Sequence, residues 1–293
     1  MDHKKDRLIR GTAMNGHVRA LLVRTTSLVE ELRQRHDTWP TATAAMGRTL
    51  TAAAMMGAML KGKEKLNIQI KGDGPIGQVV AEANANGEIS GYVANPHVHL
   101  PSNSLGKLDV AGAVGRSGFV NVTKDQGLKD VYTGSSPIIS GEIAEDMTYY
   151  FAVSEQTPSA VGLGVLVGTE NEVLEAGGFI IQLLPGLSDD EINAIEHAVS
   201  GLPPITTLMD QGMDLEEMLH RLLPDAVVLD EMDLRFQCQC SKERVENTLI
   251  SLGQTDLEEI IEEDGKAEVV CHFCNEKYSF DKAELQHILE QAK

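Results

Sequence analysis

The chain has 293 residues, of which 42% are hydrophobic, so it can bury an ample core in one or two domains and is not disordered throughout. Its formal net charge of -19 is unevenly placed: residues 1–186 carry 17 Lys and Arg against 19 Asp and Glu, whereas residues 187–293 carry 8 against 25. This asymmetry indicates a domain boundary, and the acidic end would be repelled by the phosphates of a nucleic acid.

Neither the N-terminus nor the apolar segments are typical of a secreted or membrane protein. Met1 to Arg7 is charged, but no apolar run follows it, so we expect no secretory signal. The longest apolar stretch, Thr41 to Leu60, is interrupted by Arg48 and several threonines, which favours a buried core helix over a membrane span. We therefore expect a cytoplasmic protein with no membrane partner.

The N-terminal part of the chain predicts hairpins and helices. Asn15-Gly16 supplies the positive φ that a tight hairpin requires, and residues 65–71 alternate as a half-buried strand. Helical spacing follows Ser27, and a second helix rich in Ala and Met follows Pro40. The expected strands are 6–12, 18–25, 65–71, 78–83 and 88–95, and the expected helices are 26–36 and 41–61.

Two motifs in this part could be mistaken for binding sites. Gly72-Asp-Gly74-Pro-Ile-Gly77 formally matches the dinucleotide fingerprint, but a second hairpin follows it instead of a helix, so we assign these glycines to turns. His97 and His99 would share one face of an extended segment. A metal site needs three or four converging ligands, and with no carboxylate nearby we interpret both histidines as surface residues.

The rest of the first 186 residues completes the core domain. Residues 101–118 are rich in Gly, Ser and Asn and predict a loop region; 119–123, 159–168 and 173–184 predict strands, and 140–156 predicts a helix. No motif of a serine hydrolase, a zinc protease or a phosphate-binding loop occurs. We therefore predict that the protein is not an enzyme.

Residues 187–232 predict an acidic helical linker. Between Leu187 and Asp230 there are ten acids and a single Arg, with helical spacing at 188–200 and 214–223 and prolines between. Like charges and prolines lower the stability of such a segment. Its apolar side chains could cover a neighbouring sheet; they are Ile192, Ile195, Val199, Leu208, Met209, Met213, Leu215, Met218, Leu219, Leu222 and Leu223.

All four cysteines of the chain fall in two tight pairs near its C-terminal end. Cys238-Gln-Cys240 is followed, after thirty residues, by Cys271-His-Phe-Cys274. This confinement argues for joint use, as metal ligands or in disulfides. Four thiolates suit a tetrahedral Zn²⁺ site, which is the commoner use of paired cysteines in a reducing cytoplasm. The tight first pair could also form a strained, labile disulfide.

The C-terminal block, residues 233–293, predicts a small domain. Helices are expected at 241–252, 256–264 and 281–292, and a strand at 266–270 leads into the second cysteine pair. A block of about 60 residues is marginal for an independent core, so a metal would supply much of its folding energy. We thus predict an α+β protein with an N-terminal mixed sheet and packed helices (1–186), a helical linker (187–232) and a small C-terminal zinc-binding domain (233–293).

The sequence resembles the redox-regulated thirty-three-kilodalton heat-shock chaperones of bacteria, the chaperonin HslO family, over essentially its whole length. The most specific segments are Arg235-Phe-Gln-Cys-Gln-Cys-Ser, Val270-Cys-His-Phe-Cys, Gln69-Ile-Lys-Gly-Asp-Gly-Pro-Ile-Gly and Gly91-Tyr-Val-Ala-Asn-Pro.

The resemblance implies an ATP-independent holdase that responds to stress. It implies one Zn²⁺ per reduced chain, held by Cys238, Cys240, Cys271 and Cys274. It also implies that oxidation releases the zinc, pairs Cys238 with Cys240 and Cys271 with Cys274, and unfolds the linker. The exposed surface then binds unfolding client proteins, and the active form is a homodimer.

Two other functions compete with this interpretation. A binding module with a purely structural zinc could bind RNA, but the acidic C-terminal third argues against a nucleic-acid partner. A thiol-disulfide oxidoreductase could use two cysteine pairs, but Lys277-Tyr-Ser-Phe follows the second pair and no thioredoxin-like pattern surrounds it.

Overall fold

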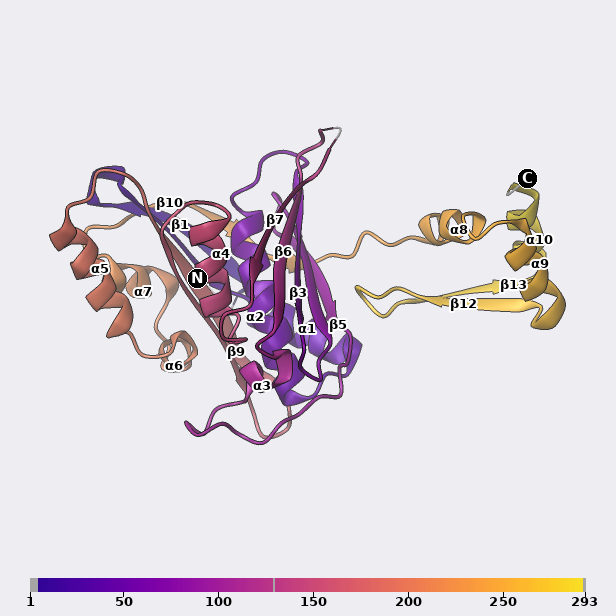
Figure 1. Ribbon diagram of the computed structural model, residues 1–293, viewed down its shortest axis with the longest axis horizontal. Helices are drawn as coiled ribbons and strands as arrows, with labels where there is room; N and C mark the ends of the chain where they lie inside the picture. Colours follow the sequence, from indigo (N-terminus) through magenta and orange to yellow (C-terminus); the bar gives the residue numbers. More distant parts are fainter. Residues whose placement is uncertain (1–4, 129, 292–293) are drawn as a thin grey trace. The chain divides into compact units, whose positions relative to one another are not determined.

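The computed structural model describes residues 5–128 and 130–291, so Met1 to Lys4 and Ala292, where the last predicted helix ends, lie outside the described residues. Two compact units make up the chain, Met1–Gln237 and Cys238–Lys293 (Figure 1). The α+β class is confirmed. The predicted division at residues 186 and 232 stays a prediction, because the linker helices belong to the first of these two units.

The first unit contains two sheets. Sheet A is antiparallel, and its outer positions belong to segments far apart in the sequence. In order across sheet A, the strands are β10 (Val227–Asp233), β1 (Arg7–Ala13), β2 (Val18–Arg24), β9 (Val173–Leu183) and β8 (Ser159–Val167). The short turn η1 (Met14–Gly16) joins β1 to β2, with Asn15 at φ 55° and Gly16 at φ 91°, as the Asn-Gly pair predicts.

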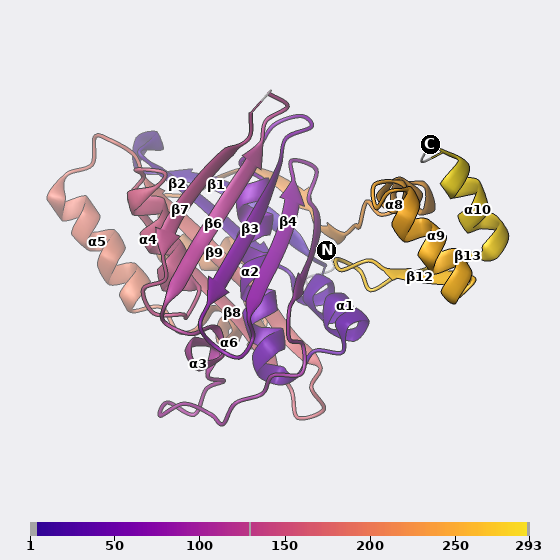
Figure 2. The ribbon, with the colours of Figure 1, turned by 45° about the vertical axis from the view of Figure 1, so that its right-hand side comes forward.

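Sheet B is antiparallel except for its first pair, which is parallel, so the sheet is mixed. Figure 2 shows its strands β4, β3, β6 and β7 side by side. In order, the strands are β11 (Arg235–Phe236), β5 (Glu88–Val93), β4 (Gln78–Asn84), β3 (Lys65–Gly72), β6 (Gly118–Asp125) and β7 (Tyr132–Pro137).

Four helices complete the core of the first unit: α1 (Thr26–His36), α2 (Pro40–Gly57), α3 (Val110–Val114) and α4 (Ala144–Val153). Helix α2 packs against strands of both sheets and is buried along almost its whole length, which its small Ala and Gly residues permit. The expectation of a buried core helix here is confirmed. Helix α3 lies within the predicted loop region 101–118. None of the helices in the described ranges is long and apolar enough to cross a membrane.

The linker segment forms a cover over sheet A. Its helices are α5 (Asp189–Ser200), α6 (Ile205–Asp210) and α7 (Leu215–Leu222). Their apolar side chains join those of β1, β2 and β9 in a second hydrophobic core, separate from the core between the sheets. The expectation that the linker covers a neighbouring sheet is confirmed. Its last part is not helical, because it forms β10 at the edge of sheet A.

The second unit is small and contains α8 (Lys242–Ile250), α9 (Gln254–Glu263), β12 (Lys266–Val270), β13 (Lys277–Asp281) and α10 (Lys282–Gln291). The two strands pair as an antiparallel hairpin. Seven buried side chains form its core: Val245, Leu249, Leu257, Ile261, Phe280, Leu285 and Ile288. A core of this size is marginal for independent folding.

Asp6 is a buried carboxyl at the point where the linker ends. It is 6% exposed, and its two oxygens accept the N–H groups of Ser27 (3.1 Å) and Leu28 (2.6 Å) at the start of α1. Its backbone carbonyl accepts the N–H of Leu234 at 3.2 Å. Burial raises the pKa of Asp6 from its ordinary 3.8 to about 6 despite these donors.

This shift predicts a pH dependence of stability. Because the pKa is raised by folding, the stabilisation is fully present below the unfolded value near 4 and is lost as the pH rises through about 6. In urea unfolding of the reduced protein, the free energy of unfolding of Asp6→Asn minus that of the wild type should increase from pH 4 to pH 7. The increase should be at most about 3 kcal/mol. A difference that does not vary with pH would contradict the assignment.

Candidate metal centre and the linker that precedes it

The four cysteines come from two loops of the second unit. Cys238 and Cys240 lie between β11 and α8, and Cys271 and Cys274 lie in the turn between β12 and β13. The turn is closed by the N–H of Cys271, which donates to the Glu276 carbonyl at 2.9 Å, and by the N–H of Asn275, which donates to the Cys271 carbonyl at 2.8 Å. The hairpin therefore fixes the spacing of the second cysteine pair.

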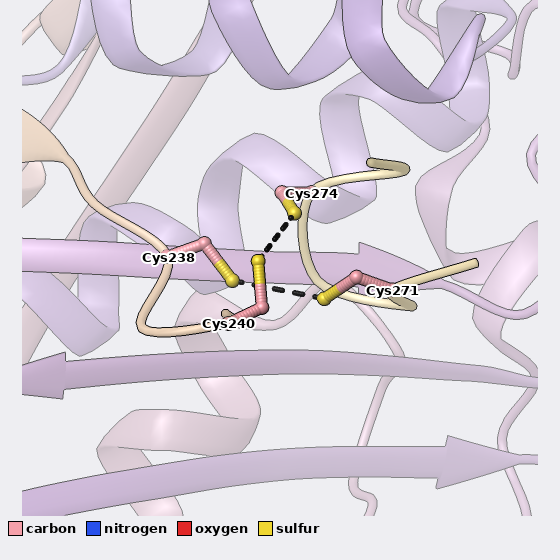
Figure 3. Close-up of side chains that lie close together, drawn as sticks. All are labelled: Cys238, Cys240, Cys271 and Cys274. Atoms are coloured by element: carbon pink, nitrogen blue, oxygen red, sulfur yellow. Dashed lines mark hydrogen bonds between the residues drawn. The ribbon is translucent and has the colours of Figure 1, made fainter. Parts of the chain in front are cut away.

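The four sulfur atoms converge on one point (Figure 3). All lie within 4.8 Å of one another; Cys238 Sγ is 3.7 Å from Cys271 Sγ, and Cys240 Sγ is 3.3 Å from Cys274 Sγ. A tetrahedral ion with metal–sulfur distances of about 2.3 Å would hold its ligands about 3.8 Å apart. The four thiols could therefore hold a metal ion, and their spacing fits a tetrahedral shell.

Two of the close sulfur contacts join the two motifs, whereas the expected disulfides lie within them. Cys238 contacts Cys271, and Cys240 contacts Cys274, at the distances above. An arrangement in which each motif contributes to each contact is what a shared ion requires. The pairing of Cys238 with Cys240 and of Cys271 with Cys274 stays a prediction.

The surroundings of the thiols favour the thiolate form of Cys240 but not that of Cys238 or Cys274. Burial raises the pKa of Cys238 and of Cys274, the latter being 4% exposed. Burial acts in the same sense on Cys240, but its pKa is lowered overall because the Tyr278 hydroxyl donates to its Sγ at 3.1 Å and neighbouring thiols add hydrogen bonds. Four thiolates this close together repel one another unless a cation balances them.

Two residues that support the cluster were not singled out in the sequence. Tyr278 donates to Cys240, and Arg244 donates from Nη1 to the carbonyl of Gln239 at 2.7 Å, which fixes the residue between the first two cysteines. The sequence gives no signal for Arg244, since its contact depends on the start of α8. Tyr278 could have been suspected only from its position after the second pair.

His97 and His99 do not take part in a metal cluster. His97 Nε2 lies 3.2 Å from an Asp37 carboxylate oxygen, and His99 Nδ1 lies 3.1 Å from the Thr41 hydroxyl. The four cysteines form the one group of three or more metal-ligating side chains found within 5–128 and 130–291. Gly72 to Gly77 joins β3 to β4, so its glycines serve a turn, as predicted.

The chain that enters the cluster is held by sheet B up to the residue before Cys238. The N–H of Arg235 donates to the Gly87 carbonyl, and the N–H of Gln237 donates to the Ile89 carbonyl, both at 3.0 Å. Arg235 also forms an ion pair with Glu88. The same segment therefore ends the linker, adds a strand to sheet B and begins the cysteine cluster.

Basic residues of β1 pair with acids of the linker. Arg7 binds Glu216 of α7 through both terminal nitrogens, at 2.7 and 2.6 Å, and Nη1 lies 3.1 Å from a carboxylate oxygen of Glu231. Arg10 Nε is 3.5 Å from Asp230. These pairs balance part of the linker's negative charge where it contacts sheet A.

Known proteins match this chain over nearly its whole length. The family described as Hsp33 protein matches residues 6–281. A 33 kDa chaperonin of Brevibacillus brevis is 56% identical over 286 residues, covering 97% of this chain and 99% of the relative, and one of Bacillus cereus is 53% identical over 288 residues, covering 98% and 99%.

A solved structure shares the fold as well as the sequence. The crystal structure of the 33 kDa chaperonin (heat shock protein 33 homolog) of Thermotoga maritima superposes with a TM-score of 0.93 at 40% identity, covering 98% of both chains. These relatives are chaperones and not enzymes, as the sequence predicts for this chain. From its cysteine cluster, its covered sheet and these matches, the chain belongs to the Hsp33 family of chaperones.

Proposed function

We propose that this protein is a redox-regulated, ATP-independent holdase of the cytoplasm. In the reduced state, Cys238, Cys240, Cys271 and Cys274 hold one Zn²⁺ per chain, and the linker covers sheet A. Oxidation forms the disulfides Cys238–Cys240 and Cys271–Cys274, the zinc is released and the linker unfolds. The uncovered surface then binds unfolding client proteins, and the active form is a homodimer.

The observation that carries this proposal is the continuity of the chain at Cys238. The residue directly before it, Gln237, is the last to hydrogen-bond sheet B, and the linker strand β10 ends only a few residues earlier. The cluster also joins two segments separated by thirty residues. Any loss of order at the cluster therefore reaches the end of the linker through covalent bonds.

A bound Zn²⁺ would balance the thiolates and cross-link the two cysteine motifs. The second unit depends on this cross-link because its core has only seven buried side chains. The apparent binding energy of zinc in small zinc-binding peptides is about 10–16 kcal/mol, which exceeds the stability of most small domains. Loss of the four ligands should therefore unfold the second unit.

The redox step balances with a two-electron oxidant such as hydrogen peroxide. Two zinc-bound thiolates lose two electrons as they form one disulfide, and one peroxide takes up these electrons with two protons from solvent to give two waters. Two disulfides consume two peroxides and remove all four sulfur ligands. A disulfide between residues two apart is strained and hence easily reduced again, which suits a reversible switch.

The linker is expected to detach from sheet A when the cysteine cluster no longer holds its end. Its contact with the sheet combines an apolar core with the ion pairs of Arg7 and Arg10, and the exposed ion pair of Lys5 with Asp233, just after the linker, adds little stability. Once β11 is no longer held, β10 and the helices before it lose an anchor.

The proposal is tested by following zinc, thiols and client aggregation together. Treatment of the reduced protein with hydrogen peroxide at mildly elevated temperature should release one zinc per chain and lower the thiol count from four to zero. The treated protein should suppress aggregation of a thermally unfolding client, and reduction with added zinc should reverse this. The proposal fails if the zinc-free, oxidised protein suppresses aggregation no better than the reduced protein.

A further inference from the structure

The face of sheet A under the linker combines apolar side chains with two arginines: Arg24 pairs with the buried Glu175 within the sheet, and Arg7, opposite Arg24 in the register, pairs with the linker. Residues on this face alternate along each strand, so Arg7 shares the face with Ile9 on β1, and Ala20, Leu22 and Phe179 continue it across β2 and β9. All four of these apolar residues belong to the core that the linker completes. A client that covers this face must therefore satisfy Arg7 as well.

Arg7 is held tightly by the linker. Its side chain is only 18% exposed, and it donates to both oxygens of Glu216 and to one of Glu231. These hydrogen bonds hold the pKa of Glu216 below its ordinary value. A bidentate arginine–carboxylate pair is geometrically specific and is stronger than a neutral hydrogen bond.

The occupant of this face in the structure is an amphipathic acidic helix. In α7, the buried residues Leu215, Met218, Leu219 and Leu222 contact the sheet, and Glu216 reaches Arg7 beside them. A client segment without an acid would leave the guanidinium covered and unpaired, which costs free energy. The linker thus presents the chemistry that the face accepts.

We propose that the uncovered face selects amphipathic client segments that carry an acidic side chain, and that Arg7 is the residue that determines this specificity. The proposal rests on the function proposed above, because the linker must leave before a client can bind. It adds charge selectivity to what would otherwise be a purely apolar surface. Segments that resemble the protein's own linker are therefore the preferred ligands.

The test uses the oxidised, zinc-free full-length protein and two fluorescein-labelled peptides. One peptide has the sequence of residues 205–223, and the other has the same sequence with Glu216→Gln. Fluorescence anisotropy should give a dissociation constant about tenfold lower for the peptide that retains Glu216, as expected for a charged hydrogen bond that is partly desolvated. Competition from the tethered linker affects both peptides equally, so the ratio is preserved.

Matched variants separate Arg7 from general electrostatics. Arg7→Gln should bind both peptides with equal affinity. Arg19→Gln should keep the preference, because Arg19 alternates with Val18 and Ala20 on β2 and so lies on the opposite face of the same sheet. With wild-type protein, the preference should also decline as salt is added. This second measurement does not depend on the folding of the Arg7 variant.

The remaining outcomes of the peptide-binding experiment test the charge selectivity and the holdase function separately. Equal binding of both peptides by the oxidised wild type, or a preference that survives Arg7→Gln, would overturn the charge selectivity and leave the holdase function intact. Failure of the oxidised wild type to bind either peptide or to suppress aggregation would overturn both. Peptide binding that falls as the protein is concentrated would show that a second copy occupies the face, and would overturn the assignment to clients.

Discussion

Replacing Cys274 by Ser, or removing the proposed zinc from the reduced protein with a chelator, should unfold residues 238–291 and leave the central strands of both sheets of the first unit folded. Cys274 is the most buried of the four thiols, and its unit has few other buried side chains. Apparent zinc energies of about 10–16 kcal/mol are far larger than a core of this size is expected to supply. The expected effect is therefore loss of the whole second unit and not local fraying.

Hydrogen exchange followed by mass spectrometry measures the loss of structure separately in each of the two units. Amides of α8, α9 and α10 should lose their protection in Cys274→Ser, while amides of α2 and of the central strands of both sheets should keep it. Ser279→Ala is a suitable control, because Ser279 is exposed on β13 of the same hairpin and is not near a ligand position. Its exchange should match that of the wild type.

The same experiment reports on the linker. If the cluster anchors the linker through β11, amides of β10 and α7 should also exchange faster after zinc removal. Protection of α7 that is unchanged while the second unit is unfolded would show that the linker does not depend on the cluster. In that case metal loss alone would not operate the switch.

The sequence predicts the cysteine cluster and the linker cover well because both depend on local patterns. The two cysteine pairs are visible as spacing, and the apolar positions of α7 repeat at helical intervals beside a capping Asp214. Neither prediction requires knowledge of distant partners. The structure adds which sheet face is covered and that the four sulfur atoms converge.

Elements that depend on distant partners could not be predicted in this way. β10 carries three acids in seven residues and is not apolar enough to indicate a strand, but it pairs with β1 from the opposite end of the chain, where Arg7 and Arg10 meet its acids. β7 reads Tyr-Thr-Gly-Ser-Ser-Pro, which is typical of a loop, and is a strand because β6 pairs with it. Tertiary pairing overrides local preference in both cases.

The largest effect without any change to the cysteines is expected from Gly164→Ala, which should release the linker from the reduced protein. A Cβ at residue 164 of β8 would lie 2.8 Å from Thr206 Cγ2, 3.2 Å from Ile205 Cγ2 and 3.4 Å from Thr206 Oγ1. Both neighbours belong to α6 of the linker, and their β-branched side chains have few alternative rotamers in a helix. The three atoms nearest to the added methyl group therefore all belong to the linker.

Overpacking of this kind costs about 1–3 kcal/mol, which corresponds to a roughly 5- to 160-fold larger population of undocked linker. Reduced, zinc-loaded Gly164→Ala should therefore show faster exchange at amides of α6 and suppress client aggregation without oxidant. Adding Thr206→Ala removes two of the three atoms that the methyl group meets, so the double variant should recover both the protection and the requirement for oxidant. Activity that persists in the double variant would show that the substitution acts on sheet A itself, because a steric effect on the linker must be relieved when its partner atoms are removed.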